Sequence, residues 1–244
     1  MAASSEDWSW INAQRLFFAR PITREWVDPV LLAEAIGLIC NLRSFEAIGP
    51  DRDYLHRSGM VLLGDTAITT AAFLPQQGRT EDFDQCLVEL PLADGSGTCF
   101  SIEGRDYQCQ GGNLGLFLSG QAMHAITARP TATLGYNLDP HRLTDLLVQL
   151  SAGSMTEEQA RLELQRPHLI NLRDPRVGEL WQWLQSLLQM VESSPMAWAE
   201  PQGELALALE ELLYRSTLLM IRPDLIELSP LSMSPPVVAP TLST

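Results

Sequence analysis

Lysine is absent from this chain of 244 residues, so its 16 permanently basic side chains are all arginines. They are outnumbered by 30 aspartates and glutamates, which gives a formal net charge of −14. A domain that binds DNA directly usually carries a basic patch that displaces counterions from the phosphates. Because the arginines are scattered along the chain, we expect no direct contact with nucleic acid.

Long apolar runs are missing as well. No stretch reaches the roughly 18 residues that a membrane-spanning helix requires. The N-terminus, Met-Ala-Ala-Ser-Ser-Glu-Asp-Trp, lacks the basic start and the apolar stretch of a signal peptide. With 45% apolar residues and a mean hydropathy of +0.00, the chain is expected to be a soluble protein of the cytoplasm that makes no contact with membranes.

Cysteine is scarce, and its four residues form no CxxC pair: Cys40, Cys86, Cys99 and Cys109. Because thiols stay reduced in the cytosol, we interpret them as small core residues. The strand register decides whether two of them meet. A two-residue hairpin loop at Glu103-Gly104 sets Cys99 opposite Gln108, whereas a three-residue loop sets Cys99 opposite Cys109.

A β-type pattern is present from about Phe45 to Leu138, where short apolar runs alternate with turns rich in Gly, Pro, Asp and Asn. One such turn is predicted at Pro75-Gln76-Gln77-Gly78. Short strands at this spacing are typical of an antiparallel sandwich or barrel, and a jelly roll closes them naturally. The predicted strands are Tyr54–Leu63, Thr66–Phe73, Gln85–Leu90, Thr98–Ile102, Tyr107–Gln110, Leu114–Leu118, Met123–Thr127 and Thr131–Leu138.

Helical signals lie on both sides of this region. An aspartate followed by proline starts a helix, because the carboxylate caps free N–H groups and proline suits the first helical position. This pair occurs at Asp28-Pro29, Asp139-Pro140 and Asp174-Pro175. After Asp139 the apolar residues recur at helical spacing, with a long stripe from Val177 to Val191.

These patterns predict an α+β protein with four segments. Residues 1–44 form an N-terminal arm and a short helix, of which 1–27 is expected to be an extended arm or a first strand. Residues 45–138 form the antiparallel β jelly-roll barrel, and residues 139–226 form a C-terminal helical subdomain. The tail 227–244 carries four prolines among serines and threonines and is predicted to be disordered.

Particular stretches narrow the interpretation. Residues 86–97, 102–107 and 111–117 resemble the N-terminal cupin-like domain of AraC-type transcriptional regulators, in which a strand ends in a proline-containing, glycine-rich turn, a hairpin has a Gly-Arg tip, and a glycine step leads into the next strand. Residues 134–143 resemble that family's last barrel strand and first helix. Residues 209–225 resemble the helix that precedes the DNA-binding module in some branches.

The resemblance implies a non-catalytic, cofactor-free module that senses a small effector inside its barrel and dimerises through its helices. We expect the effector near Cys86, Phe100 and Leu116. The leucine stripe either covers the barrel or forms the dimer seam, and an aromatic residue on two helix faces needs two apolar surroundings. The expected dimer contacts are Leu180, Trp181, Leu184 and Leu188.

A full regulator of this family continues with two helix-turn-helix units, whereas this chain ends in its Pro-, Ser- and Thr-rich tail. We therefore expect no DNA-binding module of its own. The chain would act on transcription indirectly, as a homodimer or as a heterodimer with a full-length AraC-type regulator.

Two alternatives remain open. The first is a cupin-fold metalloenzyme that uses His56, His124 and nearby carboxylates. The four histidines include no His-x-His pair, and the closest two are His124 and His141, so we predict no metal site. No serine lies in a Gly-x-Ser-x-Gly elbow either, which argues against a hydrolase. The second alternative is a degenerate barrel, filled by its own side chains, that serves only as a protein-interaction domain.

Overall fold

The computed structural model describes residues 5–18, 24–37, 40–49, 54–194 and 199–228, so residues 229–244 of the predicted disordered tail lie outside it. No helix in these ranges is long and apolar enough to cross a membrane. The helices are α1 (Ser5–Ala13), α3 (Pro29–Gly37), α4 (Pro140–Leu150), α5 (Glu157–Leu164), α6 (Pro175–Ser193) and α8 (Glu204–Ile221), with a 3-10 helix at Pro223–Leu228.

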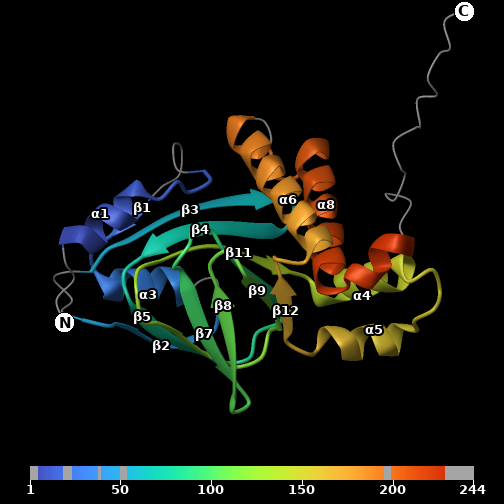
Figure 1. Ribbon diagram of the computed structural model, residues 1–244, viewed down its shortest axis with the longest axis horizontal. Coiled ribbons are helices and arrows are strands. Elements are labelled where there is room, and N and C mark those ends of the chain that lie inside the picture. Colours follow the sequence, from blue (N-terminus) through green and yellow to red (C-terminus); the bar gives the residue numbers. More distant parts are fainter. Residues whose placement is uncertain (1–4, 19–23, 38–39, 50–53, 195–198, 229–244) are drawn as a thin grey trace, which may run out of the picture.

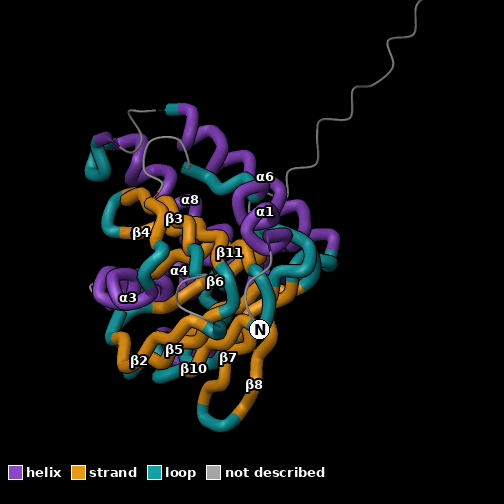
Figure 2. Tube along the Cα trace, turned by 90° about the vertical axis from the view of Figure 1, so that its left-hand side faces the viewer, coloured by secondary structure: helices purple, strands orange, loops and turns teal. Residues whose placement is uncertain are grey.

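The strands pair antiparallel in the order β1-β3-β4-β11-β6-β9-β8-β7-β10-β5-β2, and β12 pairs with β9. β8 and β9 pair only at Gln110 and Leu114, beside their connecting turn, so the sheet folds there into two facing layers. Figure 2 shows β3, β4, β11 and β6 in the upper layer and β8, β7, β10, β5 and β2 in the lower layer. The predicted α+β jelly roll followed by helices is confirmed. The strands are β1 (Arg24–Trp26), β2 (Leu42–Ala47), β3 (His56–Leu63), β4 (Thr66–Phe73), β5 (Gln76–Thr80), β6 (Cys86–Pro91), β7 (Gly97–Ile102), β8 (Arg105–Gln110), β9 (Leu114–Ser119), β10 (His124–Thr127), β11 (Thr131–Leu138) and β12 (His168–Asn171).

The largest apolar core lies between the upper layer and the helices, not between the two layers. On β11, Leu134 and Leu138 are fully buried in this core. They meet side chains of α4, α6 and α8, including Leu147, Leu188 and Leu213. Figure 1 shows α6 and α8 beside the ends of β3 and β4, with α4 below them. The predicted barrel and helical segments therefore share one core.

The three helix starts predicted from Asp-Pro pairs are confirmed. Asp28, Asp139 and Asp174 each accept a backbone hydrogen bond from the first turn of the helix that follows. The hairpin between β7 and β8 has two residues in its loop, Glu103 and Gly104, with φ of 50° and 76°. This register sets Cys99 opposite Gln108 and Thr98 opposite Cys109. All four cysteines are free, and Cys86 and Cys109 are buried.

Some predictions were wrong. The turn predicted at Pro75-Gln76-Gln77-Gly78 is wrong, because Gln76–Thr80 forms strand β5, for which β2 and β10 supply hydrogen-bonding partners on both sides. Glycine is depleted in strands, so the local sequence does not indicate a strand here. Only the pairing with β2 and β10 shows that this segment is one. Ser5–Ala13 forms a helix where an extended arm or strand was expected, although β1 does lie within residues 1–27. β12 lies in the segment predicted to be helical and extends the sheet at β9.

Candidate functional site

Two residues of β11, a strand in the middle of the upper layer, are partly exposed on the side that faces the lower layer. β11 is hydrogen-bonded to β4 on one side and β6 on the other. Its residues Leu134 and Tyr136 are buried on the helix side, so Gly135 and Asn137 point between the layers. Both remain partly exposed. Strands flank β11 and helices cover its other face, so solvent reaches these two residues from between the layers.

Small side chains line this part of the inner face. A cross-strand row runs through Thr69, Gly135, Glu89 and Leu116. A Cβ added at Gly135 would have one non-adjacent atom within 4 Å, the Val88 carbonyl oxygen at 3.8 Å. A side chain at position 135 would therefore meet little resistance from its surroundings beside Glu89.

Glu89 is the acidic side chain of this row. It lies between Val88 and Leu90, which are fully buried on the helix side, so its own side chain points between the layers. Thr98 Oγ1 donates a 2.6 Å hydrogen bond to Glu89 Oε1. Burial raises the pKa of Glu89 to about 7, against a smaller lowering by the Thr98 hydrogen bond. Near neutral pH this carboxyl group can therefore exist in either protonation state.

Two of the three residues predicted to lie near an effector come together. Phe100 and Leu116 belong to one buried cluster on the inner side, with Ile102, Cys109 and Leu118. Cys86 does not join them, because it shares the strand parity of Val88 and packs into the core beneath the helices. Effector binding by these residues stays a prediction. Sequence reasoning missed Glu89, although a lone acid within the apolar strand Cys86–Pro91 was an available signal.

A second polar group ties the two layers together at another place. Tyr54 donates a 2.6 Å hydrogen bond from its hydroxyl to Gln76 Oε1, and the same hydroxyl lies 3.5 Å from His56 Nδ1. The His56 ring stacks on Phe73 with centroids 5.1 Å apart. Burial lowers the pKa of His56 to about 4, against a smaller raising by Gln76. His56 is therefore neutral at physiological pH.

The stability of the fold should depend on pH through His56. The unfolded histidine takes up a proton near pH 6.5, whereas the folded one resists protonation down to about pH 4. Stability is therefore fully present above pH 6.5 and is lost as the pH falls towards 4. Between pH 7 and 4.5, urea denaturation should show a loss of about 2–3 kcal/mol from this group. A His56→Phe variant should lack that loss, and parallel pH profiles for the two proteins would refute it.

His56 and His124, the histidines of the metalloenzyme alternative, are not brought together. Ala125 packs in the inner cluster, so its neighbour His124 points to the outer face of the lower layer. There His124 lines a surface groove of about 510 Å³ together with Arg43 and Arg79. Within the described ranges, no three His, Cys, Asp or Glu side chains converge as a metal site.

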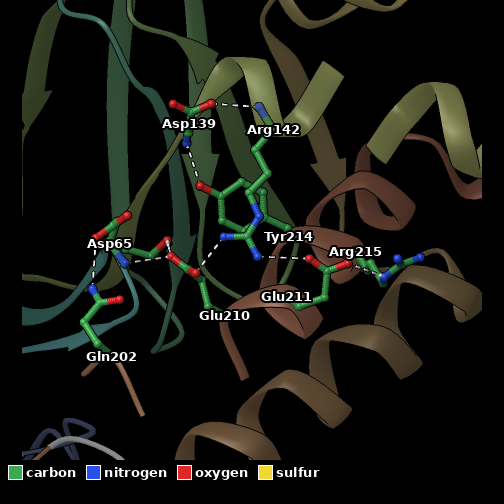
Figure 3. Close-up of polar contacts among 9 residues, drawn as sticks. Asp65, Asp139, Arg142, Gln202, Glu210, Glu211, Tyr214 and Arg215 are labelled. Atoms are coloured by element: carbon green, nitrogen blue, oxygen red, sulfur yellow. Dashed lines mark hydrogen bonds and ion pairs between the residues drawn. The ribbon is translucent and has the colours of Figure 1, made fainter. Parts of the chain in front are cut away.

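A buried carboxylate joins the upper layer to the C-terminal helix. Glu210 of α8 is 2% exposed. Its Oε1 accepts hydrogen bonds from the Asp65 backbone N–H at 2.9 Å and from Thr66 Oγ1 at 2.8 Å. Its Oε2 accepts one from Arg142 of α4 at 2.6 Å. Figure 3 shows this carboxylate between the β3–β4 turn and α4.

Arg142 is held from several sides. Its second guanidinium nitrogen donates to Glu211 at 2.9 Å, and the guanidinium carbon lies 4.2 Å from the ring centre of Tyr214. The Tyr214 hydroxyl accepts a 2.8 Å hydrogen bond from the Asp139 N–H at the start of α4. Burial raises the pKa of Glu211, but hydrogen bonds from Arg142 and Arg215 outweigh it, so that pKa lies below its ordinary value. The first helix after the barrel and α8 are thus locked together (Figure 3).

The turn that receives Glu210 requires glycine. Gly64 has a φ of +60°, and a Cβ there would lie 2.3 Å from Glu210 Oε2. Its N–H donates a 2.7 Å hydrogen bond to the Pro201 carbonyl, and Gln202 donates to Asp65 at 3.0 Å. The β3–β4 turn therefore contacts the approach to α8 as well as the helix itself.

The residues predicted for the dimer seam lie mostly inside the chain. Leu184 and Leu188 are fully buried in the core between α6 and the rest of the fold, so a partner cannot touch them. Leu180 and Trp181 are partly buried against the same core. The leucine stripe thus packs against the upper layer. This agrees with the interpretation in which the stripe covers the barrel. The apolar side chains that α6 does expose are Trp183 at 42% and Met190 at 51%.

No protein-family model matches the chain, and no curated protein is similar to it in sequence. Among solved structures, its fold is similar to that of the AraC-like transcriptional activator CuxR, with a TM-score of 0.56 and 13% identity over 79% of this chain and 65% of that chain. A predicted oxalate decarboxylase from Thermotoga maritima (TM-score 0.34, 10% identity, 51% of this chain and 98% of that one) also matches. So does the cupin domain of an XRE family transcriptional regulator from Enterobacter cloacae (TM-score 0.29, 11% identity, 34% and 95%).

These likenesses concern the fold. The chain matches less than two thirds of the length of CuxR. A cupin-like jelly roll followed by helices is thus shared with an AraC-like regulator, as the sequence resemblance implied. The absence of a DNA-binding module of its own stays a prediction.

Proposed function

We propose that the chain is a non-catalytic sensing module of AraC type, which binds a small effector between its two β layers and acts on transcription through another protein. The observation that carries this proposal is the solvent-accessible inner face around Gly135 and Asn137. A barrel packed solid by its own side chains would bury these central positions. The regulatory role is extended to this chain by analogy with the transcriptional activator that shares its fold.

Contacts between the inner-face strands and α8 support the sensing role. Tyr136, next to Gly135 on β11, lies with its hydroxyl 3.0 Å from Thr217 Oγ1 of α8. Thr66, on the same strand as Thr69, donates to Glu210 of the same helix. A ligand that shifts β4 or β11 would therefore act on α8 directly, since packed elements transmit small displacements to their neighbours.

The proposed partner is a second copy of the chain or a full-length AraC-type regulator. Its contact surface would use the side chains that α6 and α8 expose, rather than the buried stripe. The exposed apolar residues on these helices are Trp183, Met190, Leu205, Leu207 and Leu212.

A thermal-shift screen of small metabolites tests effector binding. A compound present at about 100 times its Kd stabilises the fold by about 2.7 kcal/mol, which for a chain of this size raises the Tm by about 5–10 °C. We expect such a compound to lose its effect on a Gly135→Leu variant, in which the added side chain occupies the space beside Glu89.

A Ser44→Leu variant is the matched control, because it places the same side chain on an exposed position of the lower layer. It should respond to the compound as the wild type does. A compound that stabilises the wild type and Gly135→Leu equally would place its site outside the barrel. If no compound of a broad panel stabilises the wild type, a degenerate barrel that serves only protein interaction is the better account.

A further inference from the structure

Glu89 is a partly buried acid without a countercharge in the described part of the chain. It takes part in no ion pair there, and its one side-chain hydrogen bond comes from Thr98 to Oε1. Its neighbours in the row are Gly135 and Leu116, neither of which can donate a side-chain hydrogen bond. A partly buried carboxylate with one hydrogen bond gains most from a partner that is itself charged and carries N–H groups.

The surroundings of Glu89 suit a small organic cation. The space beside Gly135 lies directly along the strand row from the carboxyl group. Tyr107, which is partly buried, adds an aromatic ring beside the cluster that encloses Phe100. Aromatic rings near a carboxylate are a common environment for ammonium and amidinium groups.

An anionic ligand would meet no basic side chain beside Glu89 among the described residues of the inner face. The arginines that share the inner strand parity, Arg24 and Arg105, stand at strand ends and are exposed. The strands packed against Glu89 are β7, β8, β9 and β11, and the other titratable side chains that face it from them are Cys109 and Tyr107. Burial raises the pKa of the Cys109 thiol well above its ordinary value, so that thiol is neutral.

We propose that Glu89 recognises an ammonium or amidinium group of the effector, so that the barrel selects small organic cations over neutral and anionic molecules of the same shape. This inference rests on the proposed function. Glu89 would accept N–H hydrogen bonds through the carboxylate oxygen that Thr98 leaves free, while Thr98 holds the carboxyl group in place. The cation would provide the countercharge that the barrel wall lacks.

Three nearly isosteric probes test the charge preference: benzamidine, benzamide and benzoate. Isothermal titration of the intact protein at pH 8 should give the tightest binding for benzamidine. The carboxyl group has a pKa of about 7, so its ionised fraction rises about tenfold from pH 6 to pH 8. The affinity for benzamidine should rise by about that factor, while the affinity for benzamide stays constant. This pH profile needs no substitution.

A Glu89→Gln variant should lose both the preference for benzamidine and its pH dependence. Glu46→Gln is the matched control, because Glu46 is an exposed acid of β2 that pairs with Gln77. It should keep both properties. Benzamidine that binds Glu89→Gln as tightly as wild type, or an affinity that does not change between pH 6 and 8, would overturn the inference.

Failure of the inference is distinguishable from failure of the proposed function. If benzamide or benzoate binds at least as tightly as benzamidine, and Gly135→Leu abolishes that binding, the barrel is an effector pocket and the cation preference is wrong. The same holds if a metabolite from the thermal-shift screen requires the Gly135 space but carries no positive charge. If no probe and no metabolite binds, both the cation inference and the proposed effector-binding function are wrong.

Discussion

Replacing Glu210 with alanine should lower the free energy of unfolding by about 3–5 kcal/mol, because it removes a buried carboxylate that accepts three hydrogen bonds, one of them from a guanidinium group. Glu210 is 2% exposed and accepts three hydrogen bonds, from Asp65, Thr66 and Arg142. Its removal leaves the Asp65 N–H and the Thr66 hydroxyl without this acceptor, whereas Arg142 keeps Glu211 as a partner. Urea denaturation followed by circular dichroism measures the effect.

Glu211 provides the matched control one position along the same helix. It also pairs with Arg142, at 2.9 Å, but its side chain is 36% exposed. Exposed ion pairs contribute about 0–1 kcal/mol, so Glu211→Ala should cost no more than that. A double-mutant cycle with Arg142→Met should give a larger coupling for Glu210 than for Glu211. If Glu210→Ala and Glu211→Ala lower the free energy of unfolding by similar amounts, the Glu210 carboxylate does not hold α8 to the β3–β4 turn.

Replacing Leu188 with alanine should cost about 2–5 kcal/mol of unfolding free energy, as expected for a large side chain removed from a packed core. Leu188 is fully buried between α6 and the rest of the fold. Thermal denaturation by calorimetry should show the loss. The self-association of the folded variant, measured by analytical ultracentrifugation, should stay that of the wild type, because a partner cannot reach this position.

Trp183 is the contrasting position on the same helix. Its side chain is 42% exposed, so Trp183→Ala should change the unfolding free energy by less than about 1 kcal/mol. Any dimer built on the exposed face of α6 should be weakened by this substitution. A Leu188→Ala protein that remains as stable as the wild type but dissociates would restore the dimer-seam interpretation of the leucine stripe.

The candidate site and the helical network meet through two strands. β4 carries Thr69 of the inner row and Thr66, which binds Glu210. β11 carries Gly135 of the same row and Tyr136, which reaches Thr217. An effector beside Glu89 would therefore contact strands whose neighbouring residues are hydrogen-bonded to α8. The stability of Glu210→Ala and the ligand response of Gly135→Leu test the two ends of this connection separately.

The capped helix starts and the Glu103-Gly104 hairpin loop were readable from the sequence because they depend on neighbouring residues. An aspartate caps the N–H groups two or three residues later, as at Asp139, and Glu103-Gly104 supplies the backbone angles of a two-residue hairpin. Alternating apolar residues gave β4 and β11 their predicted bounds. The α+β jelly roll followed from the order of such local elements.

Only the tertiary structure decided which face each element buries. Neighbouring strand residues point to opposite sides, so Cys86 and Glu89 were assigned to the helix side and the inner side only when the helices had covered one face. β5 and β12 needed distant pairing partners, and the leucine stripe needed to meet the upper layer rather than a second chain. Turns and helix caps are set by adjacent residues, whereas strand pairing and burial are set by segments that lie far apart in the chain, and the candidate site depends on the second.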